Sequence, residues 1–229
     1  MTSFRVLSHP LTHEAPVWPG NPPAAGTTPH ESIERGDTVN TTRLELFSHS
    51  GSHLDAPWHF NPDGPRAVDL PIEAFVFDRP ALVEVPKPNG GLIEPTDLEP
   101  HADLLADADL ALLRTGWSDV RRTDPSRYVH AGPVLHPAAS RRLLELAPGL
   151  RAVAIDAVSV GSPRHPDESV ETHHVLSGVG TDGRYVLIYE DLAIDRELAE
   201  AVRVYAWPLF IPGSDGSPVT VVAELDGPG

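Results

Sequence analysis

The stretch HSGSHLDAPWHF, residues 49–60, places His49, His53, Asp55 and His59 within twelve residues. All four stand at odd positions, and alternate side chains of an extended segment project to the same side. A helix would hold the first two histidines together but would turn the aspartate away. The glycine and the proline of the stretch also disfavour a helix. The spacing therefore predicts an extended or looped run with its imidazoles and its carboxylate on one side.

Two imidazoles and a carboxylate that face one side form a typical ligand set for a divalent ion. Such a set suits Zn²⁺, Mn²⁺ or Fe²⁺ better than Mg²⁺ or Ca²⁺, which favour all-oxygen sites. The sequence has no cysteine, which excludes thiolate ligands, disulfides and a cysteine nucleophile. The alternative is a polar loop that is rich in histidine by chance, since the chain has 12 histidines. The spacing favours a metal site over that alternative.

Charge and hydropathy limit the kinds of partner. The 229 residues include 17 Lys and Arg against 33 Asp and Glu, a net charge of −16 with neutral histidines, which disfavours nucleic acids and anionic membranes as partners. No run approaches the roughly 20 apolar residues that cross a bilayer. The first residues lack the basic start and apolar run of a signal peptide. We therefore expect a cytoplasmic protein without a nucleic-acid or membrane partner, while the charge says little about a small-molecule substrate held in a pocket.

Several segments have the composition of strands. TTRLELF (41–47) alternates apolar and polar residues and runs straight into the histidine stretch. RAVAIDAVSVG (151–161) is predicted as a buried strand with Asp156 inside it, where a structural hydrogen-bonding role is favoured over catalysis. Further strands are predicted for ALVEV, DLALLRT, YVLIYEDL, RVYAWPLFI and VTVVAEL, at 81–85, 109–115, 185–192, 203–211 and 219–225.

Helices are fewer than strands. HPAASRRLLELAPG (136–149) has a proline for the first turn, leucines at helical spacing and a glycine for the exit. Short helices are predicted to begin at Thr96, which has capping-box spacing to Glu99, and over 195–202. The elements do not alternate regularly, and no repeat or long linker divides the chain. The sequence predicts a single α/β domain over residues 1–229 with a mixed, largely antiparallel sheet.

Residues 49–60 resemble the motif His-x-Gly-Thr-His-x-Asp-x-Pro-x-His-Phe of the cyclase-like metal-dependent hydrolases, a family that includes bacterial kynurenine formamidase and isatin hydrolase. Other segments resemble further family elements in the same order: APVWPGNPP (15–23), RTGWSD (114–119), AIDAVSVGSP (154–163), THHVLSG (172–178) and VLIYEDL (186–192). The resemblance implies a swivelling β/β/α fold with a barrel-like core. It also implies homo-oligomers, as homodimers or homotetramers.

Carried over position by position, the resemblance implies that His49, His53 and Asp55 bind one metal ion. Asp55 would bridge to a second ion in the members that hold two. His173 and Glu190 match the further ligands of that second ion. Zinc is the expected metal and manganese the second choice, with one or two ions per chain.

Two other residues are assigned to the substrate side of the site. His59 matches the catalytic histidine of the family, a proton shuttle. Trp18, which precedes Pro19 and Gly20, is expected to form an aromatic wall of the substrate pocket, with plain packing as the alternative.

The chain departs from the family pattern at two points. Ser52 replaces the threonine of the motif and keeps its hydroxyl. A longer stretch than usual, including GVGTDGR (178–184), separates His173 from Glu190 and predicts a longer hairpin turn. His174 is adjacent to His173, so the choice of His173 as the ligand rests on its motif position. The longer stretch leaves one and two metal ions as open alternatives.

The resemblance implies a metal-dependent amidohydrolase. A metal-bound hydroxide would attack a non-peptide carbon–nitrogen bond, in an arylformamide such as N-formylkynurenine or in an isatin-like lactam, and His59 would return a proton to the leaving amine. A cyclase or dehydratase of polyketide-like natural-product biosynthesis would use the same ligands. A binding protein without turnover is a third alternative, against which the intact His59 argues. Gly-x-Ser-x-Gly is absent from the sequence, so no serine nucleophile is expected.

Overall fold

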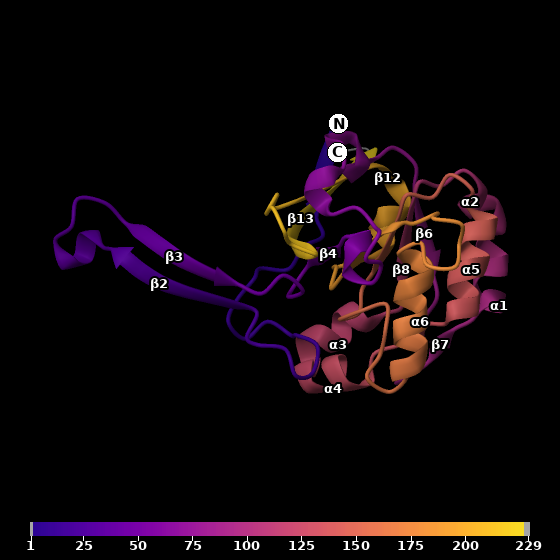
Figure 1. Ribbon diagram of the computed structural model, residues 1–229, viewed down its shortest axis with the longest axis horizontal. Helices are drawn as coiled ribbons and strands as arrows, with labels where there is room; N and C mark the ends of the chain where they lie inside the picture. Colours follow the sequence, from indigo (N-terminus) through magenta and orange to yellow (C-terminus); the bar gives the residue numbers. More distant parts are fainter. Residues whose placement is uncertain (1, 227–229) are drawn as a thin grey trace.

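A mixed sheet of nine strands forms the centre of the computed structural model, which describes residues 2–226 (Figure 1). The order is β5-β12-β13-β4-β11-β10-β8-β6, with β1 paired to β13. The pairs β4–β11, β4–β13, β12–β13, β5–β12 and β1–β13 are antiparallel, and β6, β8, β10 and β11 are parallel to one another. The strands are Thr2–Val6 (β1), His53–Asp55 (β4), Val76–Phe77 (β5), Pro80–Glu84 (β6), Leu110–Arg114 (β8), Ala152–Ile155 (β10), Leu187–Glu190 (β11), Ala201–Pro208 (β12) and Gly216–Asp226 (β13).

The two ends of this strand order lie next to each other. β5 and β6 are the terminal strands of the order, yet only Asp78 and Arg79 separate them in the chain. The buried carboxylate of Asp109 accepts hydrogen bonds from both of their backbone N–H groups, at 3.0 Å each. The sheet therefore curls towards closure, and the predicted α/β fold with a mixed, largely antiparallel sheet and a barrel-like core is confirmed.

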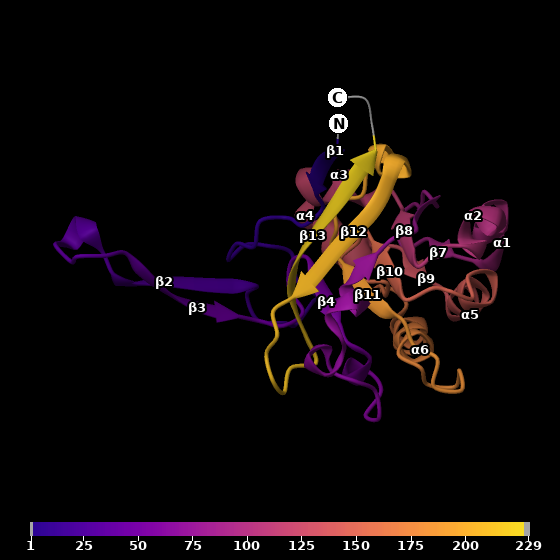
Figure 2. The same ribbon diagram turned by 90° about the horizontal axis from the view of Figure 1, so that it is seen from above.

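The central parallel strands are buried on both faces. Along β8, Ala111 and Leu113 pack on the helical side, whereas Leu110 and Leu112 pack inside the curled sheet. Alternate faces of a strand are therefore both apolar, as expected for covered parallel strands. The helices are Pro95–Leu98 (α1), Ala102–Ala106 (α2), Trp117–Thr123 (α3), Pro125–Ala131 (α4), Pro137–Leu146 (α5) and Pro166–Leu176 (α6). They contribute to one hydrophobic core, and in Figure 2 α1, α2, α5 and α6 lie together at the right of the sheet. None of the helices within residues 2–226 has the length and apolar composition needed to span a bilayer.

A two-stranded arm extends away from this body (Figures 1 and 2). It is formed by β2 (Ala25–Glu31) and β3 (Thr41–Leu46), which pair only with each other. The alternation in TTRLELF correctly predicted the strand β3. Its apolar positions do not face a core, however, because Leu44 is 62% exposed. A small parallel pair, β7 (Leu92–Ile93) with β9 (Val134–Leu135), completes the sheets of the described chain.

Three predicted helix and turn features differ from the structure in their bounds or type. The short helix predicted at Thr96 is present as α1, but it begins at Pro95, because the Asp97 carboxylate accepts the backbone N–H of Glu94 at 2.7 Å and the helix is capped two residues earlier. The short helix predicted over 195–202 is a 3₁₀ turn, after which β12 begins at Ala201. Residues 178–184 join α6 to β11, so they form a helix-to-strand loop and not a hairpin turn.

Helix α6 was not predicted, although its signals are in the sequence. Pro166 occupies the first turn. Asp167 and Glu168 follow it, and their negative charges interact favourably with the positive N-terminal end of the helix dipole. The helix places His173 on its buried face. THHV matches a family element and shows no clear helical periodicity, so the sequence pattern did not predict this helix.

Asp156 lies just after β10, not inside a strand, and its carboxylate holds the start of helix α3. It is fully buried and accepts the backbone N–H groups of Thr115, Gly116 and Trp117 at 2.8, 2.9 and 3.1 Å. These are donors that the turn before α3 would otherwise leave unpaired. The structural role predicted for Asp156 agrees with these contacts.

Replacement of Asp156 by alanine is expected to lower the free energy of unfolding by about 3 kcal/mol, because several buried N–H groups lose a charged acceptor. Urea unfolding followed by circular dichroism measures this. Asp119→Ala on the exposed side of the same helix is the control and should change stability by less than about 0.5 kcal/mol. Equal effects of the two substitutions would contradict this role of Asp156.

Candidate metal centre

Strand β4 carries the centre of the site. His53 and Asp55 are two residues apart in β4, so their side chains share one face, and both are buried. Antiparallel pairing with β11 places Glu190 opposite His53, and pairing with β13 places Gly216 opposite Asp55. Strand pairing therefore brings the carboxylate of Glu190, which is distant in the sequence, next to His53 and Asp55.

His53 faces both carboxylates with the same ring nitrogen. Its Nε2 lies 3.3 Å from Asp55 Oδ1 and 3.3 Å from Glu190 Oε2. Its Nδ1 lies 2.8 Å from the carbonyl oxygen of Gly51, which can only accept, so Nδ1 carries a hydrogen. This contact fixes the ring and leaves Nε2 directed at the carboxylates. The turn depends on Gly51, whose φ of +60° is a conformation that glycine adopts easily.

His173 repeats this arrangement from helix α6. Its Nδ1 donates to the carbonyl oxygen of Ser169 at 2.6 Å, one helical turn earlier. Its Nε2 lies 3.5 Å from Glu190 Oε1 and 3.7 Å from Asp55 Oδ2. The neighbouring His174 is only half-buried and lies edge-on to the ring of Phe60. Of the two histidines, His173 is the one that the structure directs into the cluster.

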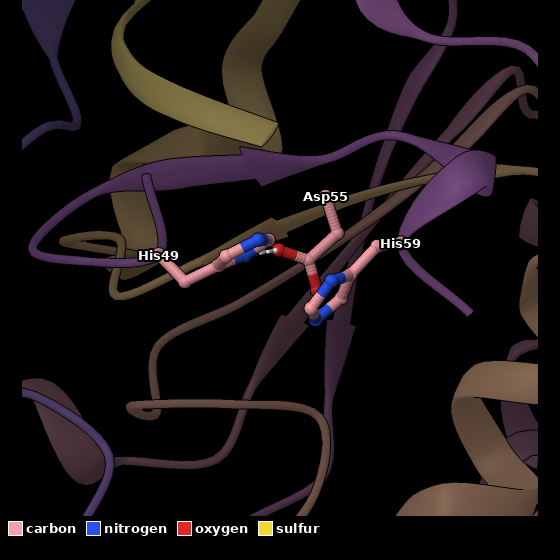
Figure 3. A group of neighbouring side chains, drawn as sticks. All are labelled: His49, Asp55 and His59. Carbon is pink, nitrogen blue, oxygen red and sulfur yellow. Dashed lines mark hydrogen bonds and ion pairs between the residues drawn. The ribbon is translucent and has the colours of Figure 1, made fainter. Parts of the chain in front are cut away.

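His49 and His59 also lie beside Asp55 (Figure 3). His49 comes from the loop before β4, and its Nδ1 lies 2.7 Å from Asp55 Oδ1. His59 ends a 3₁₀ turn, Pro57–His59, and its ring stacks on that of His49 with centroids 3.8 Å apart. The four odd-numbered residues do meet, as predicted. A single extended run does not bring them together, since a turn on each side of β4 folds the outer two histidines inward.

Asp215, which sequence reasoning missed, joins the same two histidines. Its Oδ2 lies 2.8 Å from His49 Nε2 and 3.0 Å from His59 Nδ1. Asp215 directly precedes β13, and its backbone carbonyl accepts the N–H of Ala56 next to β4. The only local signal was an acid in the turn PGSDGSP between two predicted strands. Gly216 permits the approach, because a Cβ there would meet His49 Cε1 at 2.8 Å.

Glu190 is held in place by a second missed residue. Its Oε1 accepts the hydroxyl of Ser159 at 2.9 Å and the backbone N–H of Val160 at 2.7 Å. Its other oxygen stays directed at His53. Ser159 lay in a segment that matched a family element, but nothing in the sequence linked it to Glu190.

Buried charge dominates the electrostatics of the cluster. Burial favours neutral forms, yet the neighbouring imidazoles hold the pKa of Asp55 well below its usual range and lower that of Glu190. Burial likewise opposes protonation of His49, but the charge of Asp55 and the hydrogen bond to Asp215 raise its pKa to about 9. The pKa of His53 is also raised by Asp55 and Glu190 against its burial. Asp55 and Glu190 are therefore buried as anions, and positive charge next to them stabilises the cluster.

The donor set fits a divalent ion. Ligand atoms of His53, Asp55 and Glu190 lie within 4.8 Å of one another, as do those of His49, Asp55 and His59. Asp55 belongs to both groups, and a carboxylate shared in this way could bridge two ions. The Nδ1–H groups of His53 and His173 are bonded to carbonyl oxygens, as is typical of metal-binding histidines. Their free Nε2 lone pairs would repel the carboxylates unless a proton or a cation lies between them.

A cavity of about 420 Å³ opens onto these groups. The metal-centre residues line it, and the predicted Trp18 is also among the residues that form its walls. The remaining walls are mainly apolar and include Val17, Phe47, Phe60 and Val158. The arrangement places an apolar binding space against a polar cluster of histidines and carboxylates, as is usual in small-molecule sites.

Metal-stripped protein is expected to become less stable as the pH rises from 6 to 9.5. His49 has a raised pKa in the folded state, about 9 against 6.5, so its contribution is complete below pH 6.5 and is lost as the pH passes about 9. The size of this contribution is about 3 kcal/mol. Urea unfolding in the presence of a chelator measures it. His49→Gln should make the profile shallower, since His53 keeps its raised pKa, and an unfolding free energy that is constant over this pH range would contradict the assignment.

Comparison with known proteins places the chain among characterised relatives. It is 30% identical over 215 residues to the kynurenine formamidase of Geobacillus thermodenitrificans (strain NG80-2), with 93% of each chain covered. Two solved structures share the fold. The first is isatin hydrolase A from Labrenzia aggregata bound to benzyl benzoate (TM-score 0.83, 23% identity, 98% of this chain and 94% of that one). The second is a potential metal-dependent hydrolase with cyclase activity (TM-score 0.73, 22% identity, 100% of both chains).

The model of one protein family matches most of the chain. It is described as putative cyclase, and the match covers residues 6–162, which include β4 and both turns that flank it. The family resemblance of the histidine stretch is thereby confirmed, and this chain belongs to the putative cyclase family.

Proposed function

We propose that this chain is a divalent-metal-dependent hydrolase that cleaves the carbon–nitrogen bond of an arylformamide or an aryl lactam. The observation that carries the proposal is the buried pair Asp55 and Glu190, with the Nε2 atoms of His53 and His173 directed at both carboxylates. Two buried anions and two imidazoles with fixed tautomers form a set that a divalent ion stabilises. Zinc is the first choice for that ion and manganese the second.

The proposed ligands are those that the family motif implies, and each of them has a ring nitrogen or a carboxylate oxygen in the cluster around Asp55. His49, His53 and Asp55 would hold one ion, and Asp55, His173 and Glu190 a second where two are bound. When bound, such an ion polarises a carbonyl group and lowers the pKa of water towards neutrality. One and two ions remain alternatives.

His59 is proposed as the proton carrier. Its Nδ1–H is directed at Asp215, so its Nε2 is free to accept a proton. As water adds to the carbonyl carbon, Nε2 would take its proton and then deliver it to the leaving nitrogen when the carbon–nitrogen bond breaks. Asp215 would act through His59, because it holds the ring in the tautomer that this transfer needs.

The walls of the cavity support an aromatic substrate. Trp18, Phe47 and Phe60 line it together with aliphatic side chains. Aromatic side chains bind flat rings through stacked or edge-on contacts. The names of the relatives agree with such a substrate, since they are kynurenine formamidases and isatin hydrolases.

The homodimer or homotetramer expected from the family resemblance remains a prediction. The β2–β3 arm is the feature that supports it, because a lone two-stranded hairpin is marginally stable in water. Ile33, Val39 and Leu44 are exposed on this arm. Residues Phe47 and Ser48 at its base line the cavity, so a second copy packed on the arm would lie near the site.

His53→Ala is expected to remove bound metal and abolish hydrolysis while the fold is retained. His53 Nε2 lies 3.3 Å from an oxygen of each buried carboxylate, so the loss of this imidazole should weaken metal affinity more than tenfold. Elemental analysis, N-formylkynurenine hydrolysis and circular dichroism would be measured on the same sample. His101→Ala, outside the cluster, is the matched control. Full metal content in the His53 variant would overturn its assignment as a ligand.

His59→Gln is expected to separate binding from turnover. The glutamine keeps a polar side chain but carries no proton between water and the leaving group, so kcat should fall by about 10²-fold or more. Metal content should stay at the level of the unaltered protein. Steady-state kinetics with zinc-loaded and manganese-loaded protein would check this. A variant that retains kcat would remove His59 from the mechanism.

A further inference from the structure

Asp191 directly follows Glu190, and its backbone has a conformation that is unusual for a residue with a side chain. Its φ is +54°, in the left-handed region that glycine adopts most easily. Within the described residues 2–226, Asp182 is the only other non-glycine residue with a positive φ, and it lies in an exposed turn. Such conformations cost free energy and persist where neighbouring contacts enforce them, often at functional sites.

The side chain of Asp191 is held by two helices. Its carboxylate is buried, and Arg121 of α3 donates to both oxygens, from Nε at 2.6 Å and from Nη2 at 2.8 Å. Tyr128 of α4 donates its hydroxyl to Oδ1 at 2.6 Å. Burial and the charge of Asp191 hold the pKa of Tyr128 well above its usual range, so the phenol keeps the hydrogen that it donates. The three side chains form a buried clamp, in which the bidentate arginine fixes the geometry of the carboxylate.

The backbone of Asp191 is tied to the strand that carries two of the proposed ligands. Its carbonyl oxygen accepts a hydrogen bond from the hydroxyl of Ser52 at 2.6 Å, and its N–H donates to the carbonyl oxygen of Ala157 at 2.8 Å. Ser52 directly precedes His53, and His53 pairs with Glu190 across β4 and β11. The Ser52 contact therefore lies one residue beyond this pair and links the residues that flank it.

The position of the Glu190 carboxylate depends on the backbone on either side of it. Its Oε2 lies 3.3 Å from His53 Nε2, and its Oε1 lies 3.5 Å from His173 Nε2. Two hydrogen bonds hold the carboxylate itself. The side chain nevertheless starts from a backbone whose next residue is Asp191, so a change of conformation there would shift the carboxylate. A shift of about 0.5 Å is enough to impair a metal site.

We propose that Asp191 is a positioning residue of the metal centre, held by Arg121 and Tyr128 in the left-handed conformation that places Glu190 for metal binding. This inference rests on the proposed function, because it takes Glu190 as a metal ligand. Asp191 is not itself proposed as a ligand, since both of its carboxylate oxygens have partners on α3 and α4. It acts through the backbone that it shares with Glu190.

Two substitutions of Asp191 separate the backbone conformation from the lost carboxylate. Asp191→Gly and Asp191→Ala both leave Arg121 and Tyr128 without their acceptor, but only glycine adopts a positive φ at little cost. Zinc affinity of the folded protein is measured by competition with a chromophoric chelator. The alanine variant should lose about tenfold or more in affinity, and the glycine variant should recover about threefold of that loss. Equal affinities of the two variants would overturn the proposal.

Tyr128→Phe is a milder substitution, which removes one hydrogen bond from the clamp and keeps the aromatic ring. It tests the same role if the Asp191 variants do not fold. Its zinc affinity should fall about threefold, because the carboxylate of Asp191 is then held by Arg121 alone. An affinity equal to that of the unaltered protein would contradict the role of the clamp.

Asp109→Ala is the matched control. Asp109 is an equally buried carboxylate that accepts a hydrogen bond from an arginine, Arg151, at 3.1 Å. It directly precedes β8, at the opposite end of the parallel strands from Glu190. Its loss should lower the free energy of unfolding without a change in the zinc affinity of the folded protein. If the Asp191 variants also lose stability and keep their zinc affinity, the clamp is structural only and the proposal is overturned.

Hydrolysis of N-formylkynurenine by the same samples separates this proposal from the proposed function. Weaker zinc binding by the Asp191 variants, in a protein that shows no turnover, would support the positioning role and reject the hydrolase. Turnover by the unaltered protein, with the same zinc affinity in every variant, would keep the hydrolase and reject the positioning role. Absence of zinc binding by the unaltered protein would overturn both.

Discussion

The structure depends on the burial of two carboxylates, Asp55 and Glu190, against each other in the middle of a sheet. Buried charge without a partner is costly, and like charges raise that cost further. Fixed hydrogen-bond donors offset this cost. Ser159 and the backbone N–H of Val160 donate to Glu190, and imidazole rings face both carboxylates. Such a site is most stable with positive charge between its groups, so the proposed metal binding would be linked to the stability of the fold and to its pH dependence.

The contacts outside the ligand set determine how the site can work. Carbonyl oxygens of a loop and of helix α6 fix the tautomers of His53 and His173, so that Nε2 of each faces inward. Asp215 does the same for His59 and also contacts His49. One carboxylate thereby connects His49, a proposed metal ligand, to His59, the proposed proton carrier.

Local patterns predicted much of this protein because they report on neighbours in the chain. The strands at 81–85, 109–115 and 185–192, the helix at 136–149 and the common face of His53 and Asp55 follow from periodicity and proline placement. The errors arose where a local rule had a competitor. The capping box was predicted between Thr96 and Glu99, but Asp97 bonds the backbone N–H of Glu94, so α1 begins earlier. The loop before Glu190 follows helix α6, which the sequence pattern did not predict.

The sequence by itself determined the ligand types, since the absence of cysteine and the motif of residues 49–60 left histidine and carboxylate as donors. Motif order also named Glu190 and His173, but it could not place them. Only the tertiary structure decided that β11 and β13 flank β4, which puts Glu190 opposite His53 and brings Asp215 to His59. The physical reason is that strand pairing and burial join residues more than one hundred positions apart. A cluster formed in this way cannot be recognised from the periodicity of the sequence.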